Sequence, residues 1–195
     1  MSDSSEDPSG SSSATHELDG PSSRIRIHTR ATGLLARFAH DLEIEVPAPE
    51  GEVTVDGESW SATLRLSAAR LRVVGVLRKG QVDEGVLSAS DKDEIRQRMD
   101  EQVFPRASTV VVRAEGEQTG RGSAKVELGK GHQKVSLRHA VEQRDDGSTR
   151  VEGRLELSLR ALGVKEIKGP LGAFKVHDGV DVLYSCVVRP IARGA

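Results

Sequence analysis

The sequence predicts an all-β protein, an antiparallel up-and-down β-barrel of about eight strands with one short amphipathic helix. Two observations predict this class. Apolar and polar residues alternate along most of the chain, as in strands with one apolar and one polar face. Turn segments rich in Gly and Asp separate these stretches, which favours hairpins between consecutive strands.

The predicted strands start at residue 24. Segment 60–68, for example, places Trp60, Leu64 and Leu66 on one face and Arg65 on the other. Segment 151–160 predicts an unbroken strand of roughly 30 Å, at about 3.3 Å per residue. Long strands with a continuous apolar face indicate a tall barrel. The strand segments are 24–30, 41–46, 60–68, 110–112, 133–143, 150–160 and 179–188.

A helix is predicted in the middle of the chain. Ser90 or Asp91 is the expected N-cap, with Asp93 or Glu94 as its capping-box partner. Acidic residues in the first turn suit the helix dipole. Pro105 ends the helix, because the residue before a proline disfavours the helical conformation.

This helix has one narrow apolar stripe that recurs every four residues, formed by Ile95, Met99 and Val103. The stripe must pack against another element. If the barrel holds a ligand, the helix can cover the open end. The alternative is a helix packed on the outer wall.

The two ends of the chain differ from its body. Residues 1–23 contain five acids, no Lys or Arg and many Ser, so they are predicted to form a disordered acidic tail. The barrel domain is expected to span 24–190, followed by a short C-terminal tail, 191–195. No signal peptide or membrane span is recognisable, which predicts a cytoplasmic protein. Cys186 is the only cysteine, which excludes an intramolecular disulfide.

An eight-stranded barrel has room for a small ligand inside. Aromatic residues make up 3% of the chain, and a mostly aliphatic wall suits a flexible hydrocarbon better than a flat ring. The alternative is a filled barrel that acts as a protein-interaction module. The candidate cavity-lining residues are Leu42, Ile44, Trp60, Leu64, Leu66, Ile95, Met99, Val135, Leu137, His139, Leu155, Leu157 and Tyr184.

Two histidines are candidates for polar roles. His40, next to Asp41, is expected near a barrel mouth, where it would either contact the head group of a ligand or anchor the irregular segment 31–40. His139 falls on the apolar face of its strand. It would either bond a neighbour such as Tyr184 or orient a head group inside a cavity.

Several segments, in order, resemble the YceI-like family over about residues 24–190. They are GLLARFAHDLEIEV at 33–46, GEVTVDGESW at 51–60, Phe104-Pro105-Arg106-Ala107 after the helix, Arg160 with Gly163 and Val164, and Val176 with Asp178 and Val180. The resemblance implies an elongated, lipocalin-like barrel with a helix near one end. It also implies binding of a long isoprenoid or similar lipid tail in the interior. Many members of the family are exported.

Other classes of function find little support in the sequence. No GxSxG, HExxH, P-loop or GxGxxG motif is present, and no two histidines have metal-ligand spacing, so neither catalysis nor a metal is expected. A hydrolase or isomerase using His40 or His139 remains a third hypothesis. The basic face of segment 24–30 lacks interleaved aromatic residues, so no nucleic acid is expected. The expected partner is a lipid or isoprenoid, with no other cofactor, and a homodimer stays open.

Overall fold

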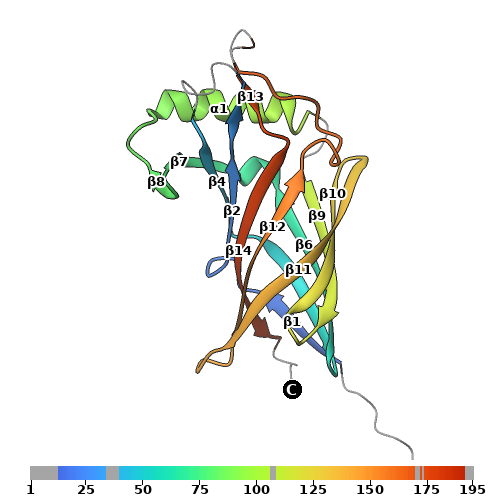
Figure 1. Ribbon diagram of the computed structural model, residues 1–195. Coiled ribbons are helices and arrows are strands. Elements are labelled where there is room, and N and C mark those ends of the chain that lie inside the picture. Colours follow the sequence, from blue (N-terminus) through green and yellow to red (C-terminus); the bar gives the residue numbers. More distant parts are fainter. Residues whose placement is uncertain (1–12, 34–39, 106–108, 170–171, 173, 192–195) are drawn as a thin grey trace, which may run out of the picture.

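The computed structural model describes residues 13–33, 40–105, 109–169, 172 and 174–191. In this part of the chain, strands form a tall antiparallel barrel, and one α-helix lies across its upper end (Figure 1). The prediction of an all-β, up-and-down barrel with one short helix is therefore confirmed.

Eight of the described strands close the barrel in the order β1-β5-β6-β9-β10-β11-β12-β14, and β14 pairs back with β1. Neighbours in this order are antiparallel. The bounds are β1 Ala14–Leu18, β5 Glu50–Asp56, β6 Ser59–Ser67, β9 Thr109–Glu117, β10 Arg121–Leu128, β11 Gly131–Gln143, β12 Thr149–Ser158 and β14 Gly179–Pro190.

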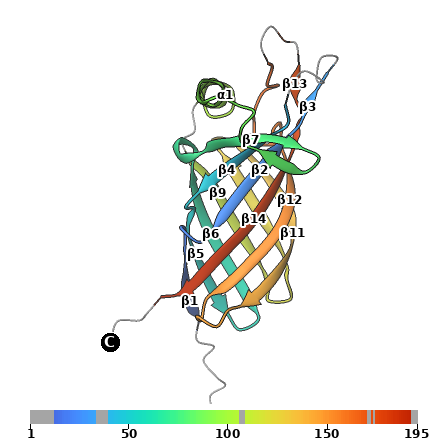
Figure 2. The ribbon, with the colours of Figure 1, turned by 90° about the vertical axis from the view of Figure 1, so that its left-hand side faces the viewer.

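The remaining strands extend the wall near the helix. Strand β14 pairs with β1 near its C-terminal end and with β2 along residues 181–185, and β2 continues the sheet through β4 and β7 to β8. Figure 2 shows β2, β4 and β7 at the upper end of the barrel. These elements are β2 Arg24–Thr29, β4 Leu42–Pro47, a 3₁₀ turn Ala68–Arg70, β7 Arg72–Arg78, β8 Gln81–Asp83, and a two-stranded sheet of β3 Ala31–Thr32 and β13 Lys175–Val176.

Strand β1 corrects the predicted domain boundary. It lies within segment 1–23, which was predicted to be disordered, yet it closes the barrel between β5 and β14. Those two strands would otherwise present unpaired backbone groups, and β1 satisfies them. The barrel therefore starts before residue 24, at Ala14. Residues 1–12 of the predicted tail and 192–195 of the predicted C-terminal tail lie outside the described residues.

Helix α1 spans Ala89–Gln102 and begins two or three residues earlier than either predicted N-cap implies. Its N-cap is Ser88, not Ser90 or Asp91. The Ser88 Oγ accepts the Asp91 N–H at 3.2 Å, and an Asp91 carboxylate oxygen accepts the Ser88 N–H at 2.8 Å. The helix ends before Pro105, as predicted. Residues 106 and 107 of the motif that follows lie outside the described part.

Two clusters of buried apolar residues stabilise the upper half of the barrel. The first joins β10, β12 and β14 to the loop after β12, and the second joins β2 and β4 to the 3₁₀ turn. Their buried members are Val126, Leu128, Leu157, Leu162, Val164 and Val180 in the first cluster, and Ile25, Ile44, Val46, Ala68 and Leu71 in the second.

Candidate functional site: an apolar cavity inside the barrel

The barrel is hollow. A cavity of about 870 Å³ runs through its interior, and residues of all eight barrel strands, of β2 and β4, and of α1 line it. Alternation along each strand directs every second side chain inward, so the aliphatic faces of the strands become the cavity wall. The volume lies towards the upper end of the range of about 300–1,000 Å³ that is typical of small-molecule sites.

Nearly all the predicted lining residues do line this cavity. They are Leu42, Ile44, Trp60, Leu64, Leu66, Ile95, Met99, Leu137, His139, Leu155, Leu157 and Tyr184. Val135 is the exception. Its side chain packs against the first buried cluster and does not reach the cavity wall.

The apolar stripe of α1 faces the cavity, since Ile95, Met99 and Val103 all line it. No residue of α1 is buried, so the helix covers the upper end of the barrel without packing tightly into it. Of the two positions considered for the helix, the structure has the one over the end of the barrel (Figure 2).

Sequence reasoning missed the contribution of β1. His16 and Leu18 line the cavity, and they alternate with the exposed residues Thr15 and Glu17. The pattern is only five residues long and follows a Ser-rich stretch, so by itself it does not predict a strand. Cys186 is buried and also lines the cavity from β14.

Small residues keep part of the interior open. Ala62, Ala114 and Ala124 are register partners on β6, β9 and β10, and all three line the cavity. Two residues further along these strands, Trp60 is level with Gly116 and Gly122. A Cβ atom on either glycine would lie about 3 Å from Cζ2 of Trp60, so the indole ring occupies the space that these glycines leave.

Three titratable groups of the cavity wall, Cys186, Tyr184 and His139, favour their neutral forms. Burial raises the pKa of the Cys186 thiol to about 12 and is the main cause that raises the pKa of Tyr184 to about 12. Burial also lowers the pKa of His139, whose ring contacts Trp60 edge-on at a centroid distance of 5.4 Å. At neutral pH these side chains offer hydrogen bonds but no charge.

Charged residues line the cavity at the end covered by α1. Arg98 donates to Glu94 at 2.8 Å within the helix, and Arg30 lies 3.9 Å from Asp181. His40 lines this mouth and is exposed. Its neighbour Asp41 accepts the backbone N–H of Ala31 at 2.8 Å, so the carboxylate of this predicted pair has a structural role.

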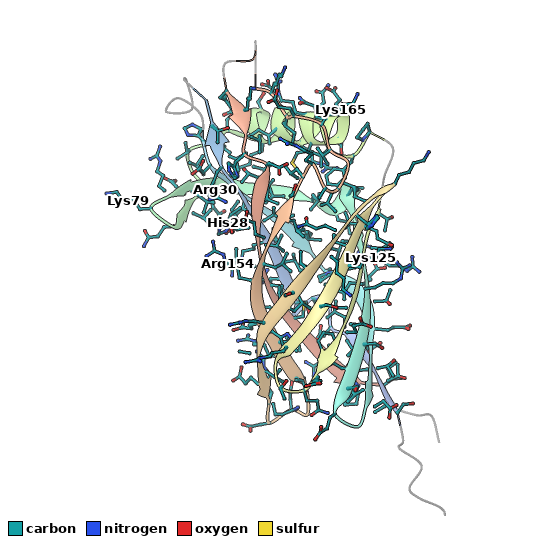
Figure 3. The ribbon with its side chains drawn as sticks, turned by 45° about the vertical axis from the view of Figure 1, so that its right-hand side comes forward. His28, Arg30, Lys79, Lys125, Arg154 and Lys165 are labelled. Carbon is teal, nitrogen blue, oxygen red and sulfur yellow. The ribbon has the colours of Figure 1, made fainter. Side chains whose placement is uncertain are left out.

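The outer surface is polar, as the alternation requires. Figure 3 shows His28, Lys125 and Arg154 projecting from the outside of the barrel. Beneath such side chains, Glu45 on β4 is buried and accepts hydrogen bonds from Arg24 at 3.0 Å and from Arg72 at 3.1 Å. Burial acts to raise the pKa of Glu45, but the two arginines outweigh it and hold the pKa below its ordinary value.

The described residues contain neither a metal-binding cluster nor a membrane-spanning helix. No group of three or more His, Cys, Asp or Glu side chains in that part of the chain could hold a metal ion. No helix there is both long enough and apolar enough to span a bilayer.

Comparisons with known proteins support the barrel fold. No family model and no curated protein matches the sequence. Among solved structures, the chain is similar to a polyisoprenoid-binding domain from Saccharophagus degradans implicated in plant cell wall breakdown. The TM-score is 0.64 and the identity 11%, with 91% of this chain and 99% of that domain covered. It is also similar to BcnA of Burkholderia cenocepacia, with a TM-score of 0.62 and 13% identity over 87% of this chain and 98% of BcnA.

These similarities define the class of the protein by its fold. In its described residues it is a tall antiparallel barrel with an apolar interior and one helix across an end, a fold that it shares with these two solved structures.

Proposed function

We propose that this chain binds one long apolar lipid, of the polyisoprenoid class or a similar tail, inside its barrel without transforming it. The observation that carries the proposal is the cavity of about 870 Å³ with its mainly aliphatic wall. Carriage, storage or sensing of the lipid would each use this cavity in the same way.

The energetics of burial support a lipid. Each methylene transferred from water into an apolar site contributes about 0.8 kcal/mol to binding. The summed contribution of a tail of many carbons is therefore large, even after the costs of association are subtracted. Side chains from α1, such as Ile95 and Met99, would cover the part of the tail nearest the mouth. The similarity to a domain described as polyisoprenoid-binding adds support from the fold.

The other two hypotheses fit the interior less well. A protein-interaction module needs no hollow barrel, and filling the cavity would bury more apolar surface. A hydrolase or isomerase needs a base with an orienting partner beside a reacting group. The ring of His139 is packed against Trp60 instead, and His40 is exposed at the mouth.

Native mass spectrometry of protein purified without detergent tests the proposal, followed by organic extraction of the bound species. We expect an isoprenoid or fatty-acid-like lipid at about one per chain, or its uptake by delipidated protein. Protein that carries no lipid and takes up neither isoprenoids nor fatty acids would favour the interaction module.

A further inference from the structure

The cavity reaches the lower end of the barrel, opposite α1. The lining residues Val55, Gln118, Gln143 and Thr149 lie in or beside the hairpin turns at that end. Helix α1 crosses the upper end, whereas the described elements at the lower end are hairpins and the ends of β1 and β14 (Figure 1, Figure 2). In the described part of the chain, a helix therefore covers the cavity at one end only.

Strand β11 shows that the lower end is open. Its inward-facing side chains become steadily more exposed towards that end: Leu137 is 7% exposed, His139 is half-buried and Val141 is 46% exposed. Val141 nevertheless lines the cavity, so its exposed surface belongs to the inner face of the wall. Since this side chain points inwards, water reaches it through the lower end of the barrel. We call this opening, lined by Val141 and Gln143, the lower mouth.

The strand register explains the lower mouth. The pairing of β10 with β11 ends at Arg121 and Arg138, and the His139 N–H donates to the Gly120 carbonyl oxygen at 2.9 Å. Residues 140–143 then pair with β12 alone. The β11–β12 hairpin thus extends below the turn between β9 and β10. Its inward face has no described strand beside it on the β10 side, so this part of the apolar wall stays uncovered.

The two ends of the cavity differ in charge. The Arg, Lys, Asp and Glu side chains that line it in the described part of the chain all lie at the end covered by α1. They are Arg30, Asp91, Glu94, Arg98 and Lys168. At the lower mouth the polar lining groups are uncharged, and the Thr149 hydroxyl donates to the Gln143 side chain at 2.9 Å. A polar head group needs hydrogen-bonding partners or water, which the α1 end supplies, whereas an apolar tail needs neither.

We propose that the cavity is a tunnel in which a lipid lies with its head group at the α1 end, and that a long tail leaves through the lower mouth. This inference rests on the proposed lipid-binding function. On β14 the lining residues run from Val180 to Val188, about 26 Å at about 3.3 Å per residue. At a strand tilt of about 40°, this corresponds to a height of about 20 Å. The ligand class is therefore a lipid whose extended tail is longer than the barrel is tall.

A short and a long prenol test the inference. The extended tail of farnesol is shorter than the barrel, and that of solanesol is much longer. Delipidated protein is titrated with each prenol, presented in methyl-β-cyclodextrin, and the Kd is followed by the fluorescence of Trp60. Trp60 is the only tryptophan of the chain and lines the cavity, so it reports occupancy. Each variant is compared with the wild type on the same prenol, so that the contribution of the carrier cancels.

Val141→Phe places a ring in the lower mouth. We expect the Kd for solanesol to rise about fifteenfold, the effect of withdrawing about two methylenes from the apolar wall, and the Kd for farnesol to stay unchanged. Gln143→Phe narrows the same mouth from a second position and should act in the same direction. Glu142→Phe is the matched control, because Glu142 is exposed on the outer face between them and its ring should change neither Kd. Thermal unfolding checks that each variant folds.

The other outcomes separate this inference from the proposed function. If Val141→Phe and Gln143→Phe both bind solanesol as the wild type does, the tail does not use the lower mouth and the tunnel is refuted, while lipid binding stands. The same follows if the wild type binds farnesol but not solanesol. Equal weakening of both prenols would place the head group at the lower mouth and overturn the orientation. If the wild type binds neither prenol, the proposed function fails and this inference fails with it.

Discussion

Filling part of the cavity from one small residue should weaken lipid binding strongly while leaving the barrel intact. Ala114 is the best position, because its register partners on both sides are also alanines that line the cavity. Ala114→Phe adds a ring of six carbons at this level. If the ring excludes about four methylenes of a tail, at about 0.8 kcal/mol each, the loss is about 3 kcal/mol. The Kd should rise about 200-fold.

The assay is titration of delipidated protein with phytol, followed by Trp60 fluorescence. Ala140→Phe is the matched control, because Ala140 is exposed on the outside of β11, and we expect its Kd to equal that of the wild type. The melting temperature of ligand-free Ala114→Phe should equal or exceed that of the wild type, since the ring buries apolar surface in open space. Unchanged phytol binding by Ala114→Phe would refute the claim that the tail occupies the cavity. A large fall in melting temperature would refute the claim that space exists there.

Three further predictions follow from other parts of the structure. Glu45→Gln should lower the free energy of unfolding at pH 7 by about 2 kcal/mol, the scale of hydrogen bonds to a charged group. Because the folded-state pKa of Glu45 lies below the unfolded value, its stabilisation is present above about pH 4.3 and lost as the pH falls through the folded pKa. Urea unfolding from pH 7 to 3 should therefore show a shallower decline in the variant, and parallel curves would contradict the assignment. The Cys186 thiol, with its pKa raised to about 12, should react with Ellman's reagent at pH 8 only after unfolding, and rapid labelling of the native protein would show that the wall opens there. Ser88→Ala should cost about 1 kcal/mol and accelerate amide exchange at the start of α1 but not in the barrel strands; unchanged exchange would mean that the capping box does not form in solution.

The sequence predicted the faces of the strands well, because inward and outward side chains follow directly from a period of two. Positions such as Leu64, Leu137 and Leu157 could be assigned to the interior without any knowledge of which strands pair. Val135 shares that period and faces inward, but it packs against a neighbouring cluster. Periodicity gives the direction of a side chain. Whether the side chain meets open space depends on the residues opposite, which only the three-dimensional arrangement fixes.

The sequence did not predict strand β1 or the correct N-cap of α1, because the local pattern of residues is ambiguous at both places. Segment 14–18 is too short and too polar to predict a strand by itself, and its stability comes from the two edges it pairs with. The sequence before the helix offers Ser88 and Ser90 within three positions, each followed by an acid at a suitable spacing. Local pattern cannot choose between them. In the structure Ser88 is the N-cap, and its capping box with Asp91 is complete.

If the proposed lipid fills the cavity, the stability of this barrel should depend on it. Replacing Ala62 or Ala114 with a larger aliphatic residue would stabilise the ligand-free barrel, since each added methylene buried in open space contributes about 0.8 kcal/mol. These alanines instead leave a wall that lacks packing partners when the cavity is empty. A lipid that fills the cavity supplies those contacts and binds only the folded state. At a free concentration of 100 times its Kd it would add about 2.7 kcal/mol to the free energy of unfolding, which is a large fraction of the total for a domain of this size. The ligand is therefore expected to act as the missing part of the core, and the lipid-free protein to be the less stable form.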